Sequence, residues 1–83
     1  MVFLYVLQGV NGKRYVGITN NLQRRLSEHR THHSKGGQLL GEFALVLTEE
    51  YADYSSARSR EVFLKSGQGR QWLDSILKRP EPA

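Results

Sequence analysis

No cysteine occurs among the 83 residues, which excludes disulfide bonds and thiolate metal sites. No apolar run approaches the roughly 20 residues that a membrane-spanning helix needs. The opening apolar run, residues 2–7, has no basic segment before it, so it is typical of a buried strand and not of a targeting signal. We therefore expect a cytoplasmic protein that does not associate with membranes.

The chain is too short for a second domain, because each half would be too small to bury a hydrophobic core. We expect one domain over residues 1–79 and a frayed tail at residues 80–83. In a domain of this size the large apolar residues, Trp72 among them, are needed for the core before any other role.

Acidic residues are few, eight against 12 lysines and arginines, and the net charge is +4. The cations gather in two blocks, residues 13–35 and 58–79, on either side of an acidic patch. The acidic patch consists of Glu42, Glu49, Glu50 and Asp53. A polyanion would be steered toward the basic blocks and away from the patch, although basic residues that only keep a small protein soluble would give the same totals.

Runs of strand-forming and helix-forming residues predict the order ββαβαα, an α+β fold with helices on a small, three-stranded mixed or antiparallel sheet. The strands are expected at residues 2–8, 14–18 and 42–51. The last of these contains an unbroken apolar run, which favours a central, buried strand.

Helices are expected from Asn20 or Asn21 to about Thr31, and at residues 54–66 and 70–78. Asn20 or Asn21 would cap the first helix, and Ser55 or Ser56 would lie near the cap of the second. Gly67 and Gly69 are expected to end the second helix before the third begins.

The first helix places its two adjacent arginines on different sides. At about 100° per residue, Arg25 and His29 lie within about 60° of Leu22, whereas Arg24 lies about 160° away. Arg24 is therefore expected in solvent, where it can pair with Glu28. An inward Arg25 needs a partner, which is either an acid of the protein or a phosphate of a ligand.

Glu61 also faces the apolar side of its helix, within about 60° of Ala57 and Leu64. An ion pair with Arg25, or with Lys65 one turn further on, would account for this position without any chemistry.

The hairpin between the first two strands has two open registers. A two-residue Asn11-Gly12 turn, which the sequence slightly favours, would put Tyr5 and Tyr15 on opposite faces. A three-residue loop with Gly12 as a left-handed bulge residue would pair Tyr5 with Gly17 and put both tyrosines on one face. In that register Gly17 would leave an opening for the backbone of a substrate.

Five sequence elements follow one another in order: "FLYVLQ", "RYVG", an arginine eight positions after Gly17, a histidine four positions later, and a glutamate in "ARSREVFLK". Together they resemble a GIY-YIG nuclease domain over nearly the whole chain. The run "REVFLKSGQGRQWL" is similar to small stand-alone members related to the N-terminal domain of the bacterial excinuclease C subunit.

The resemblance implies that Tyr5 and Tyr15 are the two motif tyrosines, Arg25 the catalytic arginine, His29 the accompanying histidine, and Glu61 the single ligand of one Mg²⁺ or Mn²⁺ ion. It also selects the bulged hairpin. The first motif reads Phe3-Leu4-Tyr5 and matches Gly-Ile-Tyr only at the tyrosine. No asparagine follows Glu61, where many members carry one.

The function expected from this resemblance is a metal-dependent endonuclease that hydrolyses DNA phosphodiester bonds at a single metal ion, as in DNA repair or recombination. Arg25 would hold the phosphate, and Tyr5 would act as the base or orient the water while Tyr15 binds phosphate, or the reverse. His29 is an alternative proton carrier. The residues expected to bind nucleic acid are Lys13, Arg14, Gly17, Lys65 and Arg70.

Other functions remain open from the sequence. A non-catalytic or partner-dependent nucleic-acid-binding module would keep the same residues as a vestigial site. Tight specificity would require a homodimer or a partner protein, because so small a domain leaves little surface for target recognition. A zinc site at His29, His32 and His33 is disfavoured, since no thiolate or nearby carboxylate completes it.

Overall fold

The computed structural model describes residues 1–9, 12–30 and 43–77. Its elements, in chain order, are β1 (Val2–Gly9), β2 (Arg14–Thr19), α1 (Leu22–Arg30), β3 (Phe43–Tyr51), α3 (Tyr54–Lys65) and α4 (Gly67–Leu77). The predicted order ββαβαα and the α+β class are confirmed, and the three strands form one antiparallel sheet. The predicted end of the first helix at Thr31 and the tail at residues 80–83 lie outside the described residues.

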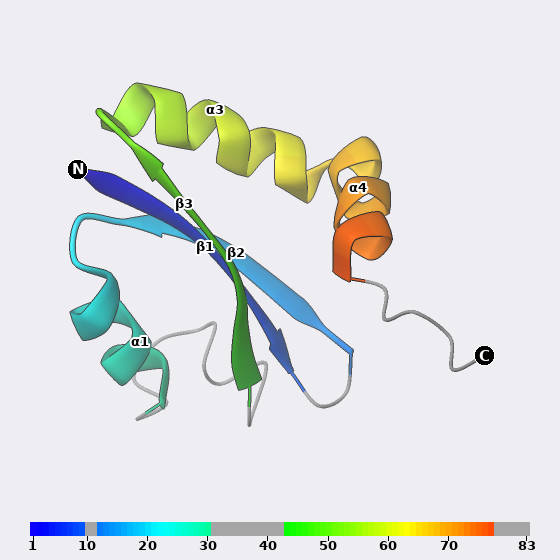
Figure 1. The fold of residues 1–83 in the computed structure, drawn as a ribbon, viewed down its shortest axis with the longest axis horizontal. Coiled ribbons are helices and arrows are strands. Elements are labelled where there is room, and N and C mark those ends of the chain that lie inside the picture. The colour runs from blue at the N-terminus through cyan, green and yellow to red at the C-terminus, as the bar shows by residue number, and fades with distance from the viewer. Residues whose placement is uncertain (10–11, 31–42, 78–83) are drawn as a thin grey trace.

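Strand β1 lies in the middle of the sheet, between β2 and β3 (Figure 1). The prediction that residues 42–51 form the central, buried strand is therefore wrong: β3 is an edge strand, and Leu45 is exposed. Both β1 and β3 contain continuous apolar runs, so the pattern identifies two strands without ranking their positions in the sheet. The central position of β1 buries all of Leu4 to Leu7.

The β1–β2 hairpin has the bulged register. Tyr5 lies opposite Gly17, and the Gly9 N–H donates to the Lys13 carbonyl at 2.8 Å. The Gly12 N–H donates to the Gly9 carbonyl at 3.0 Å, and Gly12 is left-handed with φ +84°. A glycine that leaves a four-residue turn in this conformation is the usual bulge device, so the slight preference for a two-residue turn is wrong.

The two faces of the sheet carry separate hydrophobic clusters, because side chains alternate along β1. On the face covered by α3 and α4, the buried residues are Leu4, Val6, Val16, Leu64 and Leu73. On the other face, covered by α1 (Figure 1), the cluster contains Tyr5 and Leu7, with Leu22 and Leu26 packed against them. Alternation thus brings the side chain of Tyr5 under α1.

The helix caps agree with the prediction. The side-chain oxygen of Asn21 accepts the Arg24 N–H at 3.0 Å and caps α1, as predicted. The cap of α3 is Asp53, whose carboxylate accepts the Ser56 N–H at 2.8 Å, so Ser55 and Ser56 lie near the cap as predicted. Asp53 precedes both serines, and the helix begins at Tyr54, as predicted.

Gly67 and Gly69 belong to α4, contrary to the prediction that they separate two helices. Ser66 makes the junction instead: it ends α3, and its hydroxyl accepts the Gly69 N–H at 3.2 Å. A side chain at Gly69 would collide with the Phe63 carbonyl and the backbone of Leu64. This glycine therefore allows close approach of the two helices rather than breaking either. Within the described part of the chain, no helix is long and apolar enough to cross a membrane.

Candidate active site

The hydroxyl of Tyr5 lies in a buried polar cluster between β1 and α1. It lies 3.0 Å from His29 Nε2 and accepts the Nε–H of Arg25 at 3.2 Å. Tyr5 and His29 are fully buried, whereas the Arg25 side chain keeps 31% of its surface exposed. As the helical spacing predicts, Arg25 and His29 face the sheet, while Arg24 is exposed.

Tyr15 completes the cluster through ring contacts. Its ring centre lies 6.1 Å from that of Tyr5 and 4.9 Å from that of His29. Phe43 closes the far side, with its ring centre 6.0 Å from that of His29. The structure therefore brings together four of the five residues that the resemblance singles out from distant parts of the sequence.

Gly17 makes room for this arrangement. A Cβ atom at Gly17 would lie 2.5 Å from the Tyr5 hydroxyl and 3.0 Å from Cε1 of Tyr15. The opening expected above Gly17 is therefore filled by Tyr5 itself, and the expectation that a substrate backbone enters there is wrong. The glycine serves the packing of the two tyrosines.

The charges in the cluster follow from its burial. Burial raises the pKa of Tyr5 to about 12, more than the hydrogen bond from Arg25 lowers it. The hydrogen bond to Tyr5 raises the pKa of Arg25, and burial together with the Arg25 charge lowers the pKa of His29. At neutral pH the cluster thus holds a neutral tyrosine, a neutral imidazole and one guanidinium cation.

The hydrogen-bond directions follow from these protonation states. When the neutral imidazole of His29 carries its proton on Nδ1, the Tyr5 hydroxyl donates to Nε2 and accepts from Arg25. Among the described residues, no buried side-chain nitrogen or oxygen lacks a hydrogen-bond partner. Arg25 also donates from Nη1 to Glu28 at 3.2 Å, where the sequence predicted a pair between Glu28 and Arg24.

Glu61 lies on α3, and its side chain is only 14% exposed, in agreement with its predicted inward position. Its carboxylate lies 3.2 Å from Lys65 Nζ and 3.9 Å from Arg58 Nε. Of the two ion pairs open from the sequence, the structure therefore forms the one with Lys65, while Arg25 pairs with Glu28.

The residues present fit a hard metal ion held by one carboxylate. No group of three or more histidine, aspartate or glutamate side chains that could hold a metal occurs in the described ranges. Mg²⁺ keeps several of its waters in proteins and is bound by one or two carboxylates, so Glu61 alone suits it. His32 and His33 lie outside the described residues.

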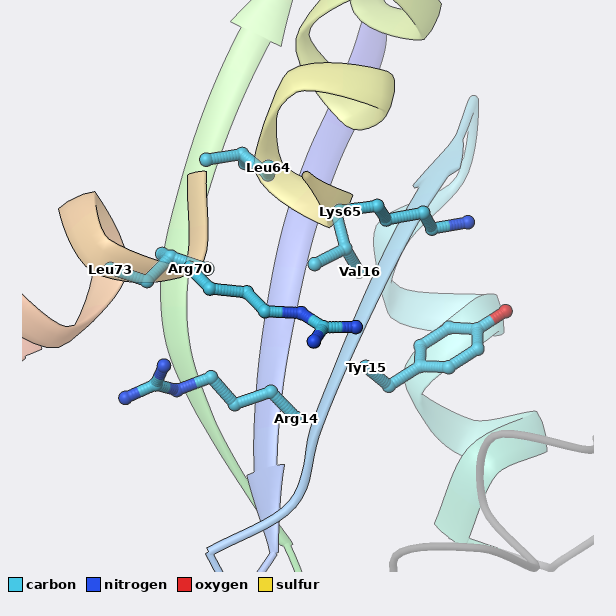
Figure 2. A pocket seen from close by; sticks show the side chains of 7 residues that line it. All are labelled: Arg14, Tyr15, Val16, Leu64, Lys65, Arg70 and Leu73. Atoms are coloured by element: carbon cyan, nitrogen blue, oxygen red, sulfur yellow. The ribbon is translucent and has the colours of Figure 1, made fainter. Parts of the chain in front are cut away.

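A basic pocket of about 240 Å³ lies beside the cluster, between β2 and the junction of α3 and α4 (Figure 2). It is lined by Arg14, Tyr15, Val16, Leu64, Lys65, Arg70 and Leu73. Three of the predicted nucleic-acid-binding residues, Arg14, Lys65 and Arg70, therefore come together. Lys13 is exposed next to the hairpin turn, and Gly17 is buried.

The sequence reasoning missed two neighbours of the cluster. Glu28 lies three residues after Arg25, a spacing at which an ion pair is expected, so this contact could have been predicted. Phe43 comes from β3, on the far side of residues 31–42 in the sequence, and no local pattern connects it with His29.

Comparisons with known proteins agree with this geometry. The family model of the GIY-YIG catalytic domain matches residues 1–72. UPF0213 protein YE0453 of Yersinia enterocolitica is 35% identical over 80 residues, which cover 93% of this chain and 80% of the relative. UPF0213 protein YhbQ of Escherichia coli is 32% identical over 94 residues, which cover 95% and 92% of the two chains.

The fold is also found in a solved relative. The solution NMR structure of UPF0213 protein BH0048 from Bacillus halodurans superposes with a TM-score of 0.58 at 27% identity, covering 96% of this chain and 89% of that one. The matched range, residues 1–72, contains the positions of all five residues that carry the resemblance. The chain therefore belongs to the GIY-YIG catalytic domain family, and its relatives are small UPF0213 proteins.

Proposed function

We propose that this protein is an endonuclease that hydrolyses phosphodiester bonds of DNA with the help of one divalent metal ion. The observation that carries the proposal is the hydrogen-bonded chain of Arg25, Tyr5 and His29, buried between α1 and the sheet. Placing a guanidinium and an imidazole on the apolar side of a short helix costs free energy of folding, because both groups lose contact with water. Such positions are typical of functional sites. Membership of the GIY-YIG catalytic domain family supports nucleic acid as the substrate class.

Arg25 is suited to hold the phosphate. A guanidinium has five N–H donors, and the bonds to Tyr5 and Glu28 use one on Nε and one on Nη1. Tyr15 is a further hydrogen-bond partner of the guanidinium, and the side chain remains partly exposed, so donors at its outer end can reach a ligand. Removing one such donor from a transition state typically costs about 3 to 4 kcal/mol, and lysine lacks the planar fork.

Tyr5 and His29 are suited to move a proton. Because the pKa of Tyr5 is raised to about 12, a tyrosinate is not present at neutral pH before the substrate binds. The attacking water would give its proton to the Tyr5 oxygen while the Tyr5 proton passes to His29 Nε2, 3.0 Å away. The Arg25 Nε–H would stabilise the negative charge that develops on the tyrosine oxygen. Tyr15, which is only partly buried beside this cluster, would bind a phosphate oxygen.

Glu61 would hold the metal ion, which when bound supplies positive charge at the phosphoryl group and the leaving oxygen. Its carboxylate is mostly enclosed and offers hard oxygen ligands. The ammonium group of Lys65 must then move away from that carboxylate.

The test is cleavage of labelled single-stranded, duplex and branched DNA in Mg²⁺ or Mn²⁺. We expect Arg25→Ala to lose about 10²–10³-fold in cleavage rate. Tyr5→Phe and Glu61→Gln should also be nearly inactive. Arg24→Ala is the matched control, since the adjacent arginine is exposed on the other side of α1 and should keep wild-type activity. Thermal unfolding checks that each variant is folded.

A second function is favoured by one observation: both oxygens of Glu61 already have cationic partners on their own helix. A non-catalytic module that binds nucleic acid would keep this pairing. Salt-sensitive binding of DNA without cutting by the wild type would select this function. Absence of both cutting and salt-sensitive binding would overturn both functions.

A further inference from the structure

The basic pocket lies at the open edge of the sheet. β2 is an edge strand, and its residues Arg14 and Val16 line the pocket on the side covered by α3 and α4. Tyr15, between them in sequence, also lines the pocket, and its side chain points toward α1 (Figure 2). Its ring contacts that of His29 on α1. The pocket and the Tyr5 cluster are therefore neighbours across one strand.

The charges around the pocket do not cancel. Arg14 is held by Asp74 at 2.6 Å and by Gln8 at 3.2 Å, and Lys65 is held by Glu61. For Arg70, no ion pair is found with any residue that the structure describes. Among the described residues, the three cations that line the pocket outnumber their two carboxylate partners, and Glu61 is also shared with Arg58. The pocket therefore keeps a net positive charge, which suits an anion such as a phosphodiester.

The size of the pocket and the residues at its floor limit which ligands it can bind. At about 240 Å³ it is smaller than the roughly 300 to 1,000 Å³ of sites that enclose drug-sized molecules. The floor consists of buried apolar side chains, Val16, Leu64 and Leu73. A low-dielectric floor strengthens the attraction between a bound anion and the cations above it. The pocket therefore suits a phosphate with its adjoining sugar rather than a whole nucleotide.

We propose that this pocket binds a non-scissile backbone phosphate of the substrate strand, next to the bond that is cut, with Arg70 and Lys65 as its ligands and Arg14 positioned by Asp74. This inference rests on the proposed function, which places the reacting phosphate at Arg25, and it adds where the neighbouring part of the same strand binds. The strand crosses the edge of the sheet at β2, with one phosphate at Arg25 and a neighbouring phosphate in the pocket. Binding at two phosphates fixes the position of the strand before any chemistry occurs.

The test measures binding of a fluorescent single-stranded oligonucleotide in EDTA, so that its result does not depend on cleavage. We expect Arg70→Gln to weaken binding several-fold and to reduce the slope of log affinity against log salt by about 0.7, the value for one lost contact with a single strand. Arg24→Gln removes an equal charge from an exposed position away from the pocket and should leave the slope close to that of the wild type.

Neutral methylphosphonate linkages, placed one at a time along the oligonucleotide, locate the contact. At one internal position, the neutral linkage should weaken binding to the wild type but not to Arg70→Gln. The linkage removes the phosphate charge and the variant removes the arginine charge, and if these two groups contact each other, losing the second costs nothing more. If only a terminal phosphate shows this coupling, the pocket is an end-binding site and the proposal is wrong. The proposal is equally overturned if Arg70→Gln and Arg24→Gln behave alike.

Cleavage in Mg²⁺ separates the two hypotheses. A wild type that binds with this coupling but never cuts would contradict the endonuclease and leave the phosphate subsite established. A wild type that cuts, with no coupled linkage, would contradict the subsite alone.

Discussion

The Tyr5 hydroxyl is held in place by steric contact as much as by hydrogen bonds. Gly17→Ala would put a methyl group 2.5 Å from this hydroxyl and 2.7 Å from Cζ of the same ring. Overpacking of this kind costs about 1 to 3 kcal/mol, and the tyrosine ring must move away from residue 17, which disturbs its hydrogen bond with His29. We expect a lower free energy of unfolding in urea and a large loss of cleavage activity.

Gly67→Ala is the control for Gly17→Ala. A Cβ atom at Gly67 meets nothing within 4 Å, and the position is the first residue of α4. Alanine there should leave stability unchanged or raise it by up to about 1 kcal/mol, since alanine favours helices. Equal stabilities of the two variants would contradict the packing assigned to Gly17.

His29 gives the protein a pH-dependent stability. Burial lowers its pKa in the folded state, so below about pH 6.5 the unfolded chain binds a proton that the folded chain does not. The free energy of unfolding should therefore fall as the pH decreases from 7 toward 5. His29→Gln should show a smaller decrease over the same range, measured by urea unfolding at each pH. Parallel curves for the two proteins would show that His29 does not titrate differently on folding.

The residue positions that the sequence predicts well are those determined by helical periodicity. Spacing along α1 separates Arg25 from Arg24 correctly, and spacing along α3 places Glu61 on the inner side. The pKa of Tyr5 could not be predicted, because it depends on how deeply β1 is covered by α1. The filled space above Gly17 depends likewise on ring positions in three dimensions.

At the scale of elements, the order of strands and helices follows from local patterns, but their arrangement does not. The edge position of β3 depends on which strand pairs with both others, and apolar content does not encode this. The start of α4 at Gly67 depends on Ser66, whose hydroxyl accepts the Gly69 N–H and so caps α4 directly after α3 ends. Only the family resemblance selected the hairpin register that β1 and β2 adopt.

Arg60 joins three elements on the outer side of the domain. Its guanidinium donates to both carboxylate oxygens of Glu49 on β3, at 3.0 and 3.3 Å, and lies 4.5 Å from the ring centre of Trp72 on α4. Arg60→Lys keeps the charge but loses the paired donors and the planar stacking. We expect a loss of about 1 to 2 kcal/mol in the free energy of unfolding.

The control for Arg60→Lys is Arg24→Lys, at an exposed helix position. It should change stability by no more than about 0.5 kcal/mol. Thermal and urea unfolding of both variants give the comparison. If Arg60→Lys is as stable as Arg24→Lys, α4 is held to the sheet by its apolar residues alone.

Across the whole molecule, the acidic patch is less available than its composition indicates. Glu49 is bound by Arg60, and Asp53 caps α3, while Glu42 lies outside the described residues. Asp53 and Lys65 lie at opposite ends of a helix of 12 residues, about 18 Å long at 1.5 Å per residue. This exceeds the Debye length of about 8 Å at physiological salt, so the acidic end hardly weakens the basic pocket.

Lys65 links the two candidate sites, since it lines the basic pocket and pairs with Glu61 at 3.2 Å. A phosphate that attracts the ammonium group frees the carboxylate for the metal ion, so DNA and metal should each favour binding of the other. In the protein alone, Lys65→Gln should bind Mn²⁺ about twofold more tightly, because a helical pair at this spacing is worth about 0.3 to 0.5 kcal/mol. Glu61→Gln should not bind the ion there, and Arg24→Gln should match the wild type. Mn²⁺ binding can be followed by electron paramagnetic resonance of the free ion, and unchanged affinity in Lys65→Gln would mean that the lysine does not restrain the metal site.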